Sequence, residues 1–227
     1  MRPDRLWQRE ILEQVRRRRS CVVKFVLPLV LTAPLLLLHV PESVRADAFT
    51  LLLIFIGVFG TAVGLIRARE SGMMVRLAVL PASPARLTGE YLLTHSLFDG
   101  LQFLVPLLLI AAPRTRDPFT LIVLGLTFFM VIFAANAIGG MVAVAAGSSG
   151  EGHLFAILSV LVVMGLSGLF RDIEGRLDPG IFLPFHYFRD VLLSSAFPIP
   201  GIVLSLVVVA ALFGTTLLIS PRLFRML

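Results

Sequence analysis

The sequence predicts an all-α integral membrane protein with six membrane-spanning helices. Of its 227 residues, 57% are hydrophobic and only 15% are charged, and its mean hydropathy is +0.94. A soluble globular domain carries about 25% charged residues, so lipid must solvate much of this apolar surface. Six apolar runs are each long enough to cross a bilayer, which takes about 20 residues. Most basic residues stand at the ends of these runs, so the net charge of +6 does not indicate nucleic-acid binding.

The six spans are expected within one transmembrane domain that covers residues 21–227. Their approximate limits are 22–40, 48–66, 91–112, 119–146, 154–170 and 201–220. Pro28 and Pro34 interrupt the first span, which neighbouring helices can tolerate. The fourth is longer than a bilayer requires, so we expect it to tilt or to bend at the Gly139–Gly140 pair. Its Ala135/Gly139 spacing allows a close helix neighbour.

Lysine and arginine predict the orientation of the chain. Fourteen of the twenty basic residues fall at or before the start of the first span, in 67–90, or at the C-terminus. The six others would lie outside: Arg45, Arg114, Arg116, Arg171, Arg176 and Arg189. The positive-inside rule therefore predicts a multi-pass protein with both termini in the cytoplasm.

The N-terminal segment, residues 1–20, is expected to form an amphipathic helix in the membrane interface. Trp7, Ile11 and Val15 recur at helical spacing opposite a polar side, and Arg16–Arg19 can contact lipid phosphates. This helix either anchors the topology only or also contacts a cytosolic partner. A cleaved signal peptide is the alternative, but its leading segment would be long and acidic and its apolar run contains two prolines.

The segment 70–90, between the second and third spans, reads ESGMMVRLAVLPASPARLTGE. Its apolar residues fall on one helical face as far as Leu80, the helix must end near Pro81, and Ala82-Ser83-Pro84 is typical of a turn. A second helix is expected from about Arg86 into the third span. We therefore predict a rigid elbow here, rather than an ordinary loop, which would be shorter and less periodic.

The segment 171–200, between the fifth and sixth spans, begins with turn-forming residues and continues as IFLPFHYFRDVLLSSAFPIP. His186, Arg189 and Asp190 make it a poor seventh span, and a seventh span would place Arg222 and Arg225 outside. A half-buried helix that dips into the outer leaflet fits this pattern better.

These features together resemble the ABC-2 type permeases, the membrane subunits of a class of ATP-binding-cassette exporters. Glu70-Ser71-Gly72 followed by Leu80-Pro81-Ala82-Ser83 is similar to the family's acidic-x-Gly…Leu-x-x-Pro-x-Ser pattern after the second span. Gly165-Leu166-Ser167-Gly168-Leu169-Phe170 resembles the family's Leu-Ser-Gly-x-Phe end of the fifth span. Leu183-Pro184-Phe185-His186-Tyr187-Phe188-Arg189-Asp190 resembles the element before the sixth, with Pro-Phe-His in place of Asn-Pro-Leu.

The resemblance implies a dimer of permease chains, identical or homologous, bound to two cytosolic ATPase subunits that hold ATP and magnesium. It also implies a cell-membrane location in a prokaryote, a coupling helix in the elbow, and re-entrant outer helices that include Pro184, His186, Tyr187, Arg189 and Asp190. The chain contains no G-x-x-x-x-G-K-[ST] phosphate loop, so we expect neither an enzyme nor a nucleotide site here. No cofactor, no metal site and no catalytic residue is expected in this chain.

The resemblance also gives the elbow residues their expected roles. Met73, Met74, Leu77 and Leu80 would seat in an apolar groove of the ATPase. Glu70 and Arg76 would fix the register at the rim. The other elbow positions that match the pattern or stiffen the turn are Gly72, Pro81 and Ser83.

Polar residues inside the predicted spans form a second candidate site. His95, Asp99 and Gln102 share one face of the third span. They either satisfy one another near the cytoplasmic end or contact substrate or relay protons. Asn136 in the fourth span is expected to bond across helices.

The substrate expected of such an exporter is amphipathic or lipid-like, because the spans offer little polar lining. A haem-exporter-like B subunit of cytochrome maturation has a similar size and topology and is an alternative. A proton-coupled secondary transporter is another, although the inverted repeats expected of one are not evident. A membrane enzyme lacks support, since no clustered carboxylates, His-rich site or nucleophile elbow is present.

Overall fold

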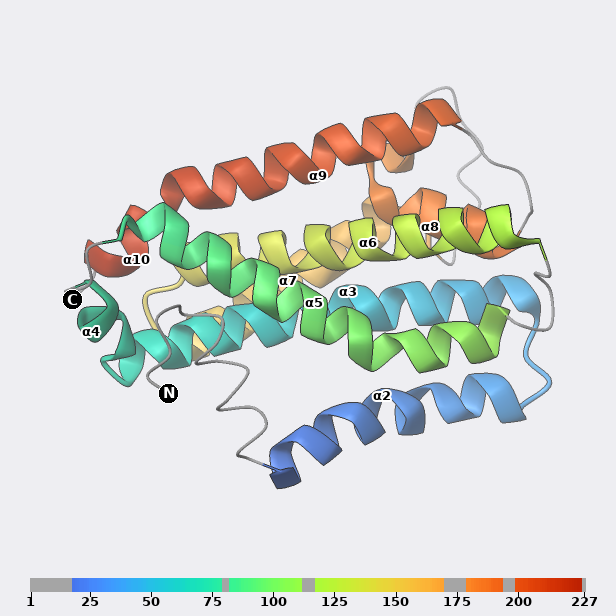
Figure 1. Cartoon of the computed structure of the whole chain (residues 1–227), viewed down its shortest axis with the longest axis horizontal. Coiled ribbons are helices and arrows are strands. Elements are labelled where there is room, and N and C mark those ends of the chain that lie inside the picture. The colour runs from blue at the N-terminus through green and yellow to red at the C-terminus, as the bar shows by residue number, and fades with distance from the viewer. Residues whose placement is uncertain (1–17, 79–81, 112–116, 170–178, 194–198, 226–227) are drawn as a thin grey trace.

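The computed structural model describes residues 18–78, 82–111, 117–169, 179–193 and 199–225, and all regular structure in these ranges is helical (Figure 1). The long helices are α2 (Arg18–Leu37), α3 (Glu42–Glu70), α5 (Pro84–Ala111), α6 (Pro118–Ala145), α7 (Ser149–Leu166) and α9 (Ile199–Ile219). The short ones are α4 (Met73–Ala78), the 3-10 helix η1 (Pro179–Phe182), α8 (Pro184–Leu193) and α10 (Pro221–Arg225).

The helix lengths confirm an all-α membrane protein. Five helices of the described ranges are long and apolar enough to cross a bilayer: α3, α5, α6, α7 and the segment Ile199–Phe224 that includes α9. The first predicted span is a shorter apolar stretch, Val22–Leu37, within α2. Pro28 and Pro34 lie inside α2 without ending it, and the Thr32 hydroxyl donates to the Pro28 carbonyl at 2.8 Å. Most of the predicted interface helix, residues 1–20, lies outside the described residues.

Helices α3 and α6 form the centre of the bundle. In each, 61% of the most apolar 18-residue window is buried, against 22% in α7 and 17% in α9. A Cβ atom built on Gly57 would lie 2.6 Å from the Ala135 Cβ, and one on Gly139 would lie 2.5 Å from the Val58 carbonyl oxygen. The close helix neighbour predicted from the Ala135/Gly139 spacing is therefore confirmed, and it is α3. Helix α6 continues as one helix through the Gly139–Gly140 pair.

Different short helices lie at the two ends of the bundle. Helices α4 and α10 lie together at the left of Figure 1, which we call the α4 end. A buried cluster there joins Met74 and Leu77 of α4 to Leu87 of α5 and Leu223 of α10. At the opposite end, called the α8 end, α8 packs against α3, α6 and α9. The cluster at the α4 end thus holds the last turn of α3 and the first turn of α5 to the C-terminal helix α10.

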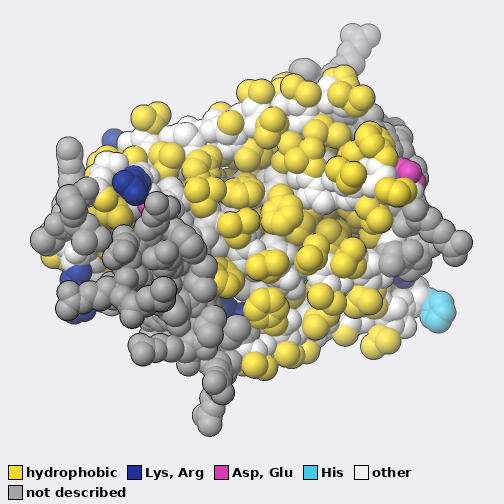
Figure 2. All heavy atoms as spheres, viewed as in Figure 1, with side chains coloured by type: hydrophobic (Ala, Val, Ile, Leu, Met, Phe, Trp, Pro, Cys, Tyr) yellow, Lys and Arg dark blue, Asp and Glu magenta, His cyan; other side chains and the backbone are white. Residues whose placement is uncertain are grey.

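The outer surface of the bundle is apolar over its middle. Figure 2 shows hydrophobic side chains over most of one face, with the described charged side chains mainly toward its ends. Leu218 on α9 is 82% exposed and Ile122 on α6 is 68% exposed. Such a surface is stable in hydrocarbon and would be costly in water.

Candidate functional site

The turn between α3 and α4 explains why the sequence has Ser71-Gly72 after Glu70. Ser71 caps the end of α3: its amide donates to the Arg67 carbonyl at 2.9 Å and its hydroxyl to the Ala68 carbonyl at 3.1 Å. The next amide, that of Gly72, donates to the Arg69 carbonyl at 3.0 Å. Gly72 has φ of +69°, a conformation that glycine adopts without a Cβ penalty. The turn is therefore fixed by hydrogen bonds and starts α4 directly.

Helix α4 corrects one sequence-based prediction. Met74 is 3% exposed and Leu77 is 5% exposed, because both pack into the cluster that contains Leu223 of the same chain. They cannot seat in a groove of another protein while they fill this core, so the predicted apolar docking face is wrong for these two residues. Met73 is half-buried against the same cluster.

The exposed side of α4 consists of different residues. Val75 is 46% exposed and Arg76 is also exposed, as is Glu70, the last residue of α3. This surface is small and mixed, with one apolar side chain beside two charged ones. Two predicted elbow residues, Leu80 and Pro81, lie outside the described ranges.

Helix α5 begins two residues before the predicted position. Ser83 is exposed, and its hydroxyl accepts from the Arg86 amide at 3.3 Å, so it caps the helix. Pro84 occupies the first helical position, where its missing N–H is not needed. The elbow therefore lies between the capped end of α3 and the capped start of α5.

Arg69, in the last turn of α3 directly before the elbow, is a buried residue that the sequence did not single out. Its side chain is 6% exposed and donates to the carbonyls of Ala143 at 3.3 Å and Ala146 at 2.8 Å. These carbonyls belong to the C-terminal end of α6, where a positive charge also complements the helix dipole. Arg69 thus ties the last turn of α3, which carries α4, to the end of α6.

A polar cluster crosses the middle of the bundle. Asn136 of α6 accepts from the Thr61 hydroxyl at 2.7 Å and donates to the Ser96 hydroxyl at 2.9 Å and to the Asp99 carboxylate at 3.1 Å. It makes the cross-helix bonds expected of it, to α3 and α5. The three bonds hold the central helices in one register.

The partners of His95 and Asp99 correct a second interpretation, that the two residues satisfy each other. Both residues lie on α5, and Asp99 is about 22 Å from the first residue of that helix at 1.5 Å per residue. Asp99 bonds Asn136, and the His95 ring lies against Tyr91 with centroids 4.2 Å apart. The partners that the structure shows for these two residues are thus other residues rather than each other.

A cavity of about 200 Å³ opens beside this cluster. Its polar lining is Lys24 of α2 and His95, Asp99 and Gln102 of α5. Its apolar lining comes from Leu27 and Pro28 of α2 and from Ile56 and Gly60 of α3. The three α5 residues that share a helix face thus meet one space, together with a lysine that the sequence did not single out.

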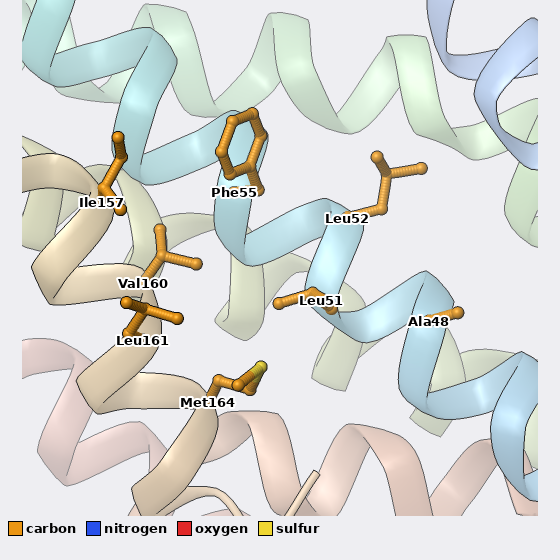
Figure 3. A pocket seen from close by; sticks show the side chains of 8 residues that line it. All are labelled: Ala48, Leu51, Leu52, Phe55, Ile157, Val160, Leu161 and Met164. Atoms are coloured by element: carbon orange, nitrogen blue, oxygen red, sulfur yellow. The ribbon is translucent and has the colours of Figure 1, made fainter. Parts of the chain in front are cut away.

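A second hollow, between α3 and α7, is entirely apolar (Figure 3). Its volume is about 360 Å³. The side chains that line it are Ala48, Leu51, Leu52, Phe55, Ile157, Val160, Leu161 and Met164. With no polar group in its lining, this groove suits hydrocarbon and offers no recognition of a polar ligand.

Helix α8 forms the re-entrant candidate at the far end. Its ten residues are too few to span a bilayer, and Pro184, Phe185, Tyr187 and Phe188 are buried. Tyr187 lies so close to Gly201 of α9 that a Cβ there would approach its ring to 2.0 Å. The described part of 171–200 thus includes a short, half-buried helix, as the sequence predicted, preceded by the 3-10 helix η1.

An ion pair ties α8 to α3, and a second charged pair lies within α8. Arg189 forms an ion pair with Asp47 of α3, and the His186 imidazole lies 3.2 Å from the Asp190 carboxylate. The Asp47 side chain is 4% exposed and the Arg189 side chain is 14% exposed. Asp47 was not predicted as a site residue, because only the fold brings it beside α8.

The described residues contain no group of three or more His, Cys, Asp or Glu side chains that could hold a metal ion. A search of curated proteins finds no significant match. A family model of the ABC-2 type transporter matches residues 5–197, which is most of the chain. The chain therefore belongs to the ABC-2 type transporter family and is a multi-pass membrane permease of an ABC transporter.

Proposed function

We propose that this permease exports an amphipathic or lipid-like substrate, and that α4 is the helix through which separate ATPase subunits drive it. The observation that carries the proposal is the elbow: a short helix at one end of the bundle, started by the hydrogen-bonded Gly72 turn, with Val75 and Arg76 exposed. ABC permeases work with ABC ATPase subunits, and in the sequence of this chain no phosphate loop is present.

The charge distribution supports a cytoplasmic position for the α4 end. Among the described side chains, five arginines lie there: Arg67, Arg69, Arg76, Arg86 and Arg222. At the α8 end the described arginines are Arg45 and Arg189. Because basic residues concentrate on the cytoplasmic side, the α4 end is the one that a cytosolic ATPase can reach.

Three connections let a displacement of α4 reach the bundle. The Gly72 turn links α4 to α3 through backbone hydrogen bonds. The Arg69 guanidinium links the same turn to the end of α6. The buried contact of Met74 and Leu77 with Leu223 links α4 to α10 and so to α9. A packed elbow of this kind moves as a unit, which suits it to transmit a rigid-body push.

The proposed assembly contains two ATPase subunits, which hold ATP and magnesium, and two permease chains, identical or homologous. Little of α7 and α9 is buried within the chain, which leaves room for a second permease chain against them. The apolar interior and the small polar cavity suit an amphipathic cargo better than a large hydrophilic one.

The proposal is tested by matched substitutions at the two ends of the bundle. Val75→Asp with Arg76→Glu is expected to abolish co-purification of the ATPase and the stimulation of its ATP hydrolysis by the permease. Val44→Asp is the control, because Val44 is also an exposed valine, at 40%, in the first turn of α3 at the other end. Retained ATPase binding in the double variant, or its equal loss in Val44→Asp, would refute docking at α4.

A further inference from the structure

Helix α9, which runs along one edge of the bundle, is firmly fixed near the α4 end (Figure 1). There the Thr216 hydroxyl donates to the Ala137 carbonyl of α6 at 3.1 Å. A Cβ atom added to Gly140 of α6 would lie 2.7 Å from the Thr216 methyl group, so the two helices are in close contact. Helix α10 begins two residues after α9, and its Leu223 is fully buried in the cluster at this end. A hydrogen bond, close packing and this cluster thus hold the last turns of α9.

The half of α9 toward the α8 end, residues 199–209, has weaker attachments. Among the described residues, no hydrogen bond or ion pair joins this half to another helix. Ile202 and Val209 lie against the central apolar cluster but are only partly buried, and Val203 is 57% exposed. Apolar contacts allow one helix to slide or tilt against another, because no directional bond has to break. This half of α9 is therefore the part that can move.

Ser205 makes the observed position of this half costly. The residue is 1% exposed, and its buried hydroxyl has no hydrogen-bond partner. Such a hydroxyl costs free energy until water or another polar group reaches it. One turn away, on the same face of α9, Gly201 lies against the Tyr187 ring of α8 with no space for a methyl group. The contact between α8 and α9 thus depends on a ring packed on a glycine, beside an unsatisfied polar group.

Helix α8 is attached more strongly to α3 and α6 than to α9. Its Arg189 forms the ion pair with the buried Asp47 of α3. The centroid of its fully buried Phe188 ring lies 6.2 Å from those of Phe49 of α3 and Phe128 of α6. Breaking a buried ion pair leaves an uncompensated charge, which costs more than sliding an apolar contact. Separation at the α8 end is therefore easiest between α8 and α9.

We propose that α9 is a hinged arm, which pivots near Thr216 and opens the bundle between α8 and α9, while α8 stays with α3 and α6. At 1.5 Å per residue, Val203 lies about 20 Å from Thr216, so a tilt of about 10° moves it by about 3 Å. The motion exposes the Ser205 hydroxyl to water or to a polar ligand. The proposal goes beyond ATPase docking and does not depend on it, because the arm belongs to the permease alone.

The experiment measures distances between spin labels by continuous-wave and pulsed EPR in the purified full-length permease in lipid nanodiscs. Cys21, the single cysteine of the chain, is first replaced by alanine. A label at Asp190 of α8 is paired either with one at Val203 of α9 or with one at Val44 of α3, and all three side chains are at least partly exposed. We expect a 190–203 distribution with a component about 3 Å or more beyond the main one, and a narrow 44–190 distribution.

Four substitutions test the residues assigned to the arm. Ser205→Ala removes the unpaired hydroxyl and should lower the population of the long component at least about twofold. Thr216→Val removes a hydroxyl that has a partner, so it should not lower that population. Gly201→Ala places a methyl group against the Tyr187 ring and should raise the population at least about twofold. Gly214→Ala is its control in the same helix, because a Cβ atom there meets no atom within 4 Å.

A 190–203 distribution as narrow as the 44–190 distribution would overturn the proposal. Equal broadening of both would also overturn it, because α8 would then move against α3. An unchanged 190–203 distribution in folded Ser205→Ala and Gly201→Ala proteins would contradict the roles of these two residues and with them the hinge. The comparison of the two label pairs needs none of these four substitutions, so it decides the question even where one of them prevents folding.

Discussion

The contact between α3 and α6 predicts a large effect for the smallest possible side-chain addition. In Gly139→Ala, the new Cβ atom would lie 2.5 Å from the Val58 carbonyl oxygen and 3.0 Å from the Thr61 Cβ. The first of these is a backbone atom, so no side chain can rotate away. Reaching the ordinary contact distance of 3.4 Å requires the helices to separate by about 0.9 Å.

The expected cost follows from this separation. Overpacking a tight core costs roughly 1–3 kcal/mol, and the better helix propensity of alanine returns at most about 1 kcal/mol. Separation of the helices would also strain the 2.7 Å bond from Thr61 to Asn136. We therefore expect Gly139→Ala to lower the free energy of unfolding by about 1–2 kcal/mol.

The assay is equilibrium unfolding of the purified permease in mixed detergent micelles. Gly125→Ala is the matched control, because Gly125 is in the same helix and a Cβ atom added to it would meet no neighbouring atom within 4 Å. It should be neutral or stabilising by up to about 1 kcal/mol. Equal free energies of unfolding for the two variants would refute the inferred close packing.

Two further predictions concern the helix ends. Arg69→Met removes the two hydrogen bonds that a buried guanidinium makes, and it should lower the free energy of unfolding by about 2–4 kcal/mol. Arg67→Met, at an exposed arginine of the same turn, should change the free energy of unfolding by less than about 0.5 kcal/mol. Similar losses in the two variants would contradict the role of Arg69. At the start of α6, hydrogen bonds from Thr120 hold the pKa of Asp117 below its usual value. The stability that this cap contributes is therefore complete above the ordinary aspartate pKa, and it is lost as the pH falls through the lowered pKa. The melting temperatures of the unaltered protein and of Asp117→Ala should therefore differ near neutral pH and converge in acid, and a constant difference would contradict this.

The sequence was sufficient to predict the helical architecture. Apolar runs identify the long helices because a bilayer demands length and hydrophobicity, whatever the tertiary contacts are. The Ala135/Gly139 spacing also identified a real contact, since small residues on one face permit close approach. The spacing could not identify the partner helix, which the structure shows to be α3.

The candidate site was harder to predict because its properties depend on tertiary packing. Helical spacing placed Met74 and Leu77 on one apolar face, but it could not tell whether that face meets another protein or the chain's own Leu223. Arg69 and Lys24 each appeared as one basic residue among twenty. Their importance comes from the end of α6 and from the cavity, and both are assembled from distant parts of the chain.

The proposed transmission of force from an ATPase to α4 is tested most directly by site-specific photo-crosslinking in the native membrane. A photoreactive residue is placed at position 75 in one protein and at position 44 in the other, and the crosslinked peptides are identified by mass spectrometry. We predict that position 75, and not position 44, crosslinks to a polypeptide that carries a G-x-x-x-x-G-K-[ST] phosphate loop. Absence of that polypeptide at position 75, or its equal capture at position 44, would contradict docking at α4.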